Sequence, residues 1–125
     1  MCSSDLLLDE AVAKVVAVGR EPAAKDFITS SKWRQGATYI VLNDLQGTVL
    51  AHSANPKMVG KVMFKAKDAS GKLFVQECIN NIKARGESVV ELKWGSPVTK
   101  KIAPAQMISK RVPGYELYIS VLIFK

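Results

Sequence analysis

The chain has 125 residues, of which 48% are hydrophobic and 23% charged, and its formal net charge is +7. This length fits one domain with a buried core, and the composition is that of a folded globular protein rather than a disordered one. Residues 1–30 hold three basic and five acidic groups, whereas residues 31–125 hold fifteen and six. The basic residues are spread out and adjacent only at Lys100-Lys101 and Lys110-Arg111. We therefore do not expect nucleic-acid binding; attraction to anionic metabolites or to a membrane surface is the other interpretation.

The two cysteines, Cys2 and Cys78, have no partner at metal-ligand or redox spacing. Cys78 falls on the apolar side of a predicted helix and is expected to be a small core residue. Cys2 precedes two serines at the start of the chain. It is either a lipid-attachment cysteine left after cleavage of a signal peptide or a chance cysteine near a start codon. We expect a membrane tether only if Cys2 is lipidated, and the sequence shows neither a signal peptide nor a run of transmembrane length.

Residues 1–30 are predicted to form an N-terminal helical segment. Its apolar residues recur at helical spacing, which predicts one buried face, at Leu8, Ala11, Val12, Val15 and Val16. Gly19 weakens this helix, and Pro22 suits the first turn of a new one. Residues 23–28 are therefore expected to form a short continuation or a separate helix.

The stretch from Tyr39 to His52 predicts a β-hairpin. Apolar residues alternate along both strands, and the turn at residues 44–47 ends in Gly47, which can supply the positive φ that such turns need. His52 is the single histidine of the chain and ends the second strand. An irregular segment follows it, and we expect a functional loop there.

One helix and three more strands complete the predicted α+β fold. The helix covers residues 72–85, and Gly86 stands where a left-handed C-cap is expected. The strands are predicted at Ser88–Trp94, Ile102–Ser109 and Tyr115–Phe124, and the last is apolar on both faces, which predicts a central place in the sheet. The prediction is one domain over residues 1–125, with a helical segment at 1–30 and, at 37–125, a five-stranded antiparallel sheet with one helix.

No catalytic or metal-binding pattern is present. A histidine-based triad would need His52 to meet a nucleophile, yet the sequence has no G-x-S-x-G or similar elbow. Zinc and iron sites need several ligands at defined spacing, and covalent haem attachment needs C-x-x-C-H. We therefore expect no enzyme activity, no metal and no cofactor.

Several motifs follow one another in an order that resembles a known family. They are N-D-x-x-G-T-V-L-A-H-S-x-N-P-x-M-V-G-K at residues 43–61, K-D-A-S-G-K-L-F-V at 67–75, K-W-G-S-P-V-T-K at 93–100 and R-V-P-G-Y at 111–115. Together they resemble the single Cache domain, a PAS-like extracytoplasmic sensor module, from about Trp33 to the C-terminus. The resemblance implies a five-stranded antiparallel sheet of order 2-1-5-4-3 with a long N-terminal helix packed on its back. In that family this helix often pairs with the same helix of a second protomer.

The resemblance also implies a ligand site. The family's histidine at the position of His52 borders the ligand cavity; from composition alone, an exposed histidine or one bonded to a backbone carbonyl is the alternative. Tyr39 and Trp94 match family aromatics that can line a pocket, and both are equally compatible with a core position. Lys67 is either an anion partner or a solvated side chain. Asp68 is expected to cap its own turn.

The sequence departs from the family pattern where many members clamp a carboxylate. A lysine and a serine-tyrosine pair on the strand before V-P-G are replaced by Ala105, Met107 and Ile108, and the tyrosine before Trp94 is Leu92. Met107 is interpreted as a packing residue, like Met58, Met63 and Phe74, and is also kept as a candidate ligand contact. The pocket should therefore take a more apolar ligand, or it has closed.

Two functional hypotheses follow. The first is a non-catalytic sensor or solute-capture domain in the periplasm, or otherwise outside the cytoplasm. It would bind a small carboxylate or a more apolar metabolite and signal through a partner. The second is an assembly module with a closed pocket, which dimerises through the N-terminal helix.

Overall fold

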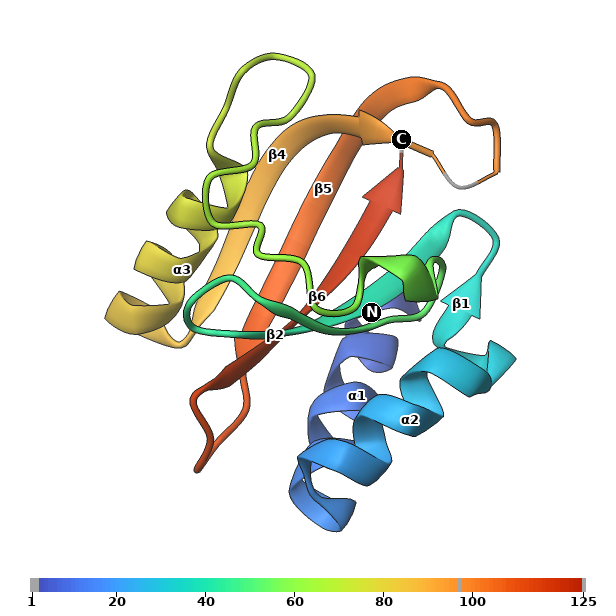
Figure 1. Ribbon diagram of the computed structural model, residues 1–125, viewed down its shortest axis with the longest axis vertical. Coiled ribbons are helices and arrows are strands. Elements are labelled where there is room, and N and C mark those ends of the chain that lie inside the picture. The colour runs from blue at the N-terminus through green and yellow to red at the C-terminus, as the bar shows by residue number, and fades with distance from the viewer. Residues whose placement is uncertain (1–2, 97, 125) are drawn as a thin grey trace.

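The computed structural model describes residues 3–96 and 98–124. Its centre is β6 (Leu117–Phe124), which pairs with β2 on one side and with β5 on the other (Figure 1). The sheet is antiparallel, in the order β1-β2-β6-β5-β4, and β3 also pairs with β2. The bounds of the other strands are β1 (Arg34–Gln35), β2 (Thr38–Asp44), β3 (Val49–His52), β4 (Glu87–Gly95) and β5 (Ile102–Arg111).

The five longer strands follow the predicted order, with the last strand in the middle. The short strand β1 was not predicted, so the sheet has six strands where the sequence predicted five. β1 pairs with Thr38 and Tyr39 at the start of β2, and β3 pairs farther along the same strand. Both β1 and β3 therefore pair with the side of β2 that faces away from β6.

Successive side chains of the central strands point to opposite faces of the sheet, so they contribute to two separate hydrophobic cores. On β2, Ile40 and Leu42 face one side, which we call the back, while Tyr39 and Val41 face the other, which we call the front. β6 divides in the same way, as predicted, with residues 117, 119 and 121 on the back and residues 118 and 122 on the front. Residues 117–122 are all buried, as expected of a strand covered on both faces.

The back of the sheet is covered by a pair of helices, α1 (Ser3–Val18) and α2 (Arg20–Thr29), which lie side by side in Figure 1. They are separated at Gly19, whose φ of 88° a residue with a side chain adopts only with strain. The long N-terminal helix implied by the resemblance is therefore two helices, as the weak point at Gly19 indicated. Within the described part of the chain, no helix is long and apolar enough to cross a membrane.

Trp33 anchors the connection from α2 to the sheet. It ends a 3₁₀ turn (Ser31–Trp33), is almost fully buried, and its indole Nε1–H donates to Asp26 Oδ2 at 2.7 Å. Its ring meets Phe27 edge-on at 4.9 Å between centroids. Trp33 was expected in a polar connection, and its burial in the core was not predicted.

On the front, α3 (Phe74–Arg85) packs against β4 and β5 (Figure 1). It ends at Gly86, whose φ of 78° is the left-handed C-cap that the sequence predicts. The buried face of α3 contains Cys78, as expected, and burial raises the pKa of its thiol. The helix begins two residues later than predicted, so Lys72 belongs to the preceding loop.

Candidate functional site

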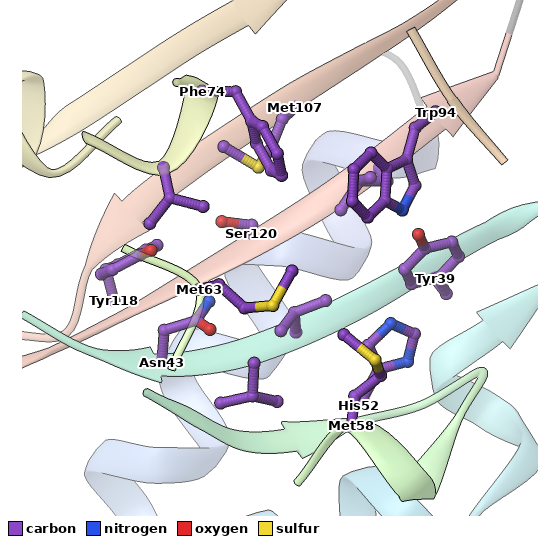
Figure 2. Close-up of a pocket in the computed structure, with 14 residues that line it drawn as sticks. Tyr39, Asn43, His52, Met58, Met63, Phe74, Trp94, Met107, Tyr118 and Ser120 are labelled. Atoms are coloured by element: carbon purple, nitrogen blue, oxygen red, sulfur yellow. The ribbon is translucent and has the colours of Figure 1, made fainter. Parts of the chain in front are cut away.

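A small cavity lies on the front of the sheet, near the start of α3 and the segment that follows β3 (Figure 2). We call it the front cavity. Its volume is about 50 Å³, which is room for a few waters or a ligand of a few non-hydrogen atoms, since one water needs about 10–15 Å³. Most of its lining is aliphatic, aromatic or thioether: Tyr39, Val41, Asn43, Val49, His52, Met58, Met63, Phe74, Val75, Trp94, Met107, Tyr118, Ser120 and Leu122.

The register between β2 and β6 forms one wall of the front cavity. Alternate residues of each strand face the front, so neighbouring cross-strand pairs stand side by side along the wall. These pairs are Tyr39 with Leu122, Val41 with Ser120, and Asn43 with Tyr118. The wall therefore ends in a tyrosine on one side and in an amide on the other.

Asn43 places a carboxamide in this wall. The residue is only 6% exposed, and within the described part of the chain its side chain makes no hydrogen bond. Every fully buried side-chain N or O atom of the described residues has a hydrogen-bond partner. The unbonded amide atoms of Asn43 are therefore not fully buried. The amide is therefore open to the cavity and available to a ligand.

His52 ends β3 opposite Val41, with its ring stacked on that of Tyr39 at 4.7 Å between centroids. Its Nδ1 accepts hydrogen bonds from the backbone N–H groups of Ala54 at 3.2 Å and Asn55 at 2.8 Å. An imidazole nitrogen that accepts carries no proton, so the proton of neutral His52 is on Nε2. Burial lowers the pKa of His52 to about 4, so the residue is a neutral donor at pH 7.

Tyr39 and Trp94 form the same end of the front cavity as His52 (Figure 2). Burial raises the pKa of Tyr39 well above its usual range, and the neighbouring Trp94 side chain opposes this only in part. The Tyr39 hydroxyl therefore keeps its proton and can donate it to a ligand. The ring of Trp94 also packs against the ring of Phe74, at 5.0 Å between centroids.

Asp68 holds the loop before α3 against β4, next to Trp94. Its Oδ1 accepts from the N–H and hydroxyl of Ser70 and from the N–H of Lys72, at 2.7 to 2.9 Å, and its Oδ2 accepts from Lys93 N–H at 2.9 Å. Desolvation alone would raise the pKa of Asp68, but these hydrogen bonds outweigh it and hold the pKa well below its usual range. Asp68 closes its turn, as predicted, and it also fixes the strand that carries Trp94.

Two methionines reach the cavity from the irregular segment after β3. Met58 ends a 3₁₀ turn (Pro56–Met58) whose start is capped by the side chain of Asn55. Met63 is placed by its N–H, which donates to the carbonyl of Gly47 at 2.8 Å. Gly47 has a φ of 87°, and a Cβ there would lie 2.9 Å from the backbone nitrogen of Phe64. This close approach requires glycine and positions the loop over the cavity.

A wider groove continues outward from the front cavity. It has a volume of about 610 Å³ and shares Tyr39, His52, Met58 and Trp94 with the cavity. Its other walls include Lys57 and Lys100, both exposed. Positive charge therefore lies in the outer groove, on the solvent side of the shared aromatic residues.

The family model named single Cache domain 2 matches residues 20–124. The chain belongs to this family. A Cache domain is a sensor domain in signal transduction, and no enzyme family is indicated. The resemblance stated from the motifs is confirmed, and the match extends into α2. No curated protein matches the chain in sequence.

Solved Cache sensor structures share this fold. A periplasmic sensor domain of a chemotaxis protein is 20% identical, with a TM-score of 0.74 over 98% of this chain and 88% of that one. A methyl-accepting chemotaxis protein from Vibrio parahaemolyticus is 16% identical, with a TM-score of 0.82 over 96% and 84%. A Cache chemosensory domain described for its carboxylic acid recognition is 17% identical, with a TM-score of 0.74 over 98% and 86%.

Four of the five predicted site residues line the front cavity of this Cache domain: Tyr39, His52, Trp94 and Met107. The fifth, Lys67, is exposed and is not among the lining residues. The positions that depart from the family pattern separate in space. Leu92 and Ala105 are buried in the front core without lining the cavity, whereas Ile108 packs with the back core.

Several lining residues were not predicted as ligand contacts. Asn43 was missed, although it lies two and four residues beyond Val41 and Tyr39 on the same strand, and period-two alternation would have placed it on the same wall. Met58, Met63 and Phe74 were interpreted only as packing residues. Their place depends on how the segment after β3 folds back, which no local pattern shows.

The described residues provide no group of three or more His, Cys, Asp or Glu side chains that could hold a metal ion. The cavity instead offers hydrogen-bonding groups at its two ends and a mostly apolar middle, where the one hydroxyl, that of Ser120, is bonded to Ser109 at 2.6 Å. Such an arrangement suits a small organic molecule.

Proposed function

We propose that this Cache domain binds a small organic molecule in the front cavity, and that binding is relayed to a signalling partner. The observation that carries the proposal is a mostly apolar cavity that is lined by hydrogen-bonding groups available to a ligand, namely the Asn43 amide, the Nε2–H of His52 and the hydroxyl of Tyr39. Buried polar groups are normally paired within the protein. Groups that are left free around a cavity are suited to pairing with a ligand.

Family membership supports the sensor role. We further propose that the domain is located outside the cytoplasm. One similar structure is described as a periplasmic sensor domain and another as a carboxylic-acid-recognising chemosensory domain. By analogy, the ligand here is a compact polar metabolite. Fractionation of cells that produce the natural protein tests the location: recovery in the cytoplasmic fraction alone would contradict it.

A thermal-shift screen of short-chain acids, amides, amino acids and apolar molecules tests the binding role, followed by calorimetry on any hit. A ligand that binds only the folded protein raises the melting temperature by mass action. Tyr39→Phe removes one cavity hydroxyl and is expected to weaken binding about five- to tenfold. Tyr115→Phe is the matched control, because Tyr115 packs with the back core.

The proposal fails if no compound shifts the melting temperature, or if Tyr39→Phe and Tyr115→Phe weaken a hit equally. His52→Ala adds a second check at the same end of the cavity, where it removes both the Nε2–H donor and the ring stacked on Tyr39.

Pairing through the N-terminal helix is a second candidate role, which the surface of α1 favours. Leu6 and Val16 are 50% and 54% exposed and lie within about 80° of each other around this helix. Val16 is therefore not on the buried face where the sequence predicted it. We propose that α1 packs against the same helix of a second copy. Sedimentation velocity over a range of concentrations would show a dimer that Val16→Lys abolishes. Val62→Lys is the control, since Val62 is 67% exposed and lies far from α1 in the chain.

Cys2, for which the sequence left lipid attachment open, lies outside the described residues.

A further inference from the structure

The front cavity is uncharged. Among the described residues that line it there is no Asp, Glu, Lys or Arg. Two positively charged residues, Lys57 and Lys100, line the outer groove instead. A ligand that enters the front cavity therefore leaves water without meeting a formal charge of either sign.

His52 cannot readily supply a positive charge. To become imidazolium it would need a proton on Nδ1, and that nitrogen faces the backbone N–H groups of Ala54 and Asn55. Protonation would replace two hydrogen bonds by two donor–donor contacts. The other side chains around the imidazole, those of Tyr39, Met58 and Trp94, bear no charge that would favour the cation. His52 thus presents a neutral Nε2–H.

Tyr39 adds a second neutral donor at the same end of the cavity. Burial raises the pKa of this hydroxyl, so its O–H stays protonated, and Tyr39 lines the same cavity as His52. The Tyr39 and His52 rings are stacked, and Figure 2 shows them together with Trp94 at one end of the cavity. Two donors here suit one acceptor oxygen. At the other end, the Asn43 amide can both donate and accept.

These features discriminate between ligands of equal shape. A carboxylate loses its hydration on entry, and without a cation the two neutral donors do not replace it. An amide or ketone oxygen loses far less hydration and accepts the same two hydrogen bonds. The volume of about 50 Å³ limits the ligand to a few non-hydrogen atoms.

We propose that the front cavity selects a small uncharged molecule with a carbonyl acceptor, of the amide or ketone class, over the carboxylate of the same shape. This inference rests on the proposed binding function and specifies its ligand class. The carbonyl oxygen accepts from His52 and Tyr39, and the remainder of the molecule lies along the apolar wall toward Asn43. In this arrangement the lysines of the outer groove do not contact the ligand.

Matched pairs of probes test the inference: acetamide against acetate, propionamide against propionate, with acetone as a ketone. Ligand-detected NMR titration at pH 7 measures even weak binding. We expect at least one neutral probe to bind about tenfold or more tightly than its carboxylate partner. Tyr39→Phe should reduce that affinity about five- to tenfold, and Tyr115→Phe should leave it unchanged. Lys57→Gln should also leave it unchanged.

Other results would overturn the inference in distinguishable ways. If a carboxylate binds as tightly as its amide and depends on Tyr39, the charge selectivity is wrong while the binding function stands. A fall in affinity in Lys57→Gln would place the anion-binding group in the outer groove and would likewise contradict the inference. If neither member of any pair binds, the inference is wrong, and the broader thermal-shift screen then decides the binding function separately.

Discussion

The two faces of the sheet are built from the same strands but are filled differently. On the back, side chains such as Phe27, Ile40 and Leu42 are fully buried in one hydrophobic core with residues of α1 and α2. On the front, the alternate residues of β2 border open space that loops and α3 only partly fill. One face is packed for stability, and the other leaves room for a ligand.

The polar groups differ in the same sense. The indole of Trp33 and the hydroxyl of Ser53 both find partners within the back half of the molecule. On the front, Cys78, Ser109 and Ser120 are bonded to one another under α3. Around the cavity, however, Asn43 has no hydrogen-bond partner for its side chain in the described chain, and His52 is bonded only at Nδ1. A face that satisfies its own polar groups gains rigidity, whereas a face that leaves them open gains recognition at some loss of stability.

The largest expected effect is on the back core. Phe27→Ala removes a fully buried ring that meets Trp33, and it should lower the free energy of unfolding by about 3–5 kcal/mol. On the front, Met63 is only partly buried and borders the cavity, so Met63→Ala should have a smaller effect. Urea unfolding of both variants measures the difference. Equal losses would show that the two faces contribute alike.

Asp68→Asn should loosen the front by releasing the loop from β4. The pKa of Asp68 is lowered in the folded state, so its contribution is complete above the unfolded pKa of about 3.9 and is lost as the pH falls toward the folded value. The wild type should therefore lose stability below about pH 4 more steeply than the variant does. Unfolding curves at neutral and acidic pH test this. Parallel pH profiles would assign the acid sensitivity to other carboxyl groups.

The two tryptophans offer a matched comparison of the faces. Trp33→Phe leaves Asp26 without the indole N–H that it accepts from at 2.7 Å, with an expected loss of about 1.5–3 kcal/mol, as for hydrogen bonds to charged groups. Trp94→Phe should destabilise less, because Trp94 is only half-buried and lies beside the cavity. Denaturant unfolding measures both, and ligand affinity should change only in Trp94→Phe.

The smallest effect comes from one added methylene on each face. Val121→Ile overfills the fully buried back core and should be destabilising by about 1–3 kcal/mol. Val49→Ile extends into the front cavity, so its stability should stay within about 0.5 kcal/mol of wild type while ligand binding weakens. A destabilisation of Val49→Ile equal to that of Val121→Ile would mean that the cavity is not open in solution.

Local patterns predicted most of the framework. Alternation on both sides of the turn before Gly47 located the hairpin, Gly86 ended α3 where expected, and two apolar rows placed β6 at the centre of the sheet. Each of these features is set by residues that are near one another in sequence. The short strand β1 was missed because two exposed residues carry no periodic pattern.

The site was less predictable because it depends on contacts distant in sequence. The place of Met63 requires Gly47 to pass against the backbone of Phe64. The place of Trp94 depends on a hydrogen bond that the backbone N–H of the neighbouring Lys93 donates to Asp68, 25 positions earlier. Ile108 was grouped with its neighbour Met107, although consecutive strand residues face opposite sides. Tyr39 and His52 were found because motif positions, rather than packing, identified them.

The hydrogen bonds that join the Asp68 loop to β4 have a further consequence for how the protein behaves in a crowded compartment. β4 is the last strand of the sheet, and its outer edge could otherwise pair with a strand of another molecule. At Lys93, however, Asp68 accepts from the N–H and Ala69 N–H donates to the carbonyl, while the Lys72 ammonium donates to the carbonyl of Glu91. The loop before α3 therefore covers this edge at residues 91–93, where it hinders pairing with a strand of another molecule.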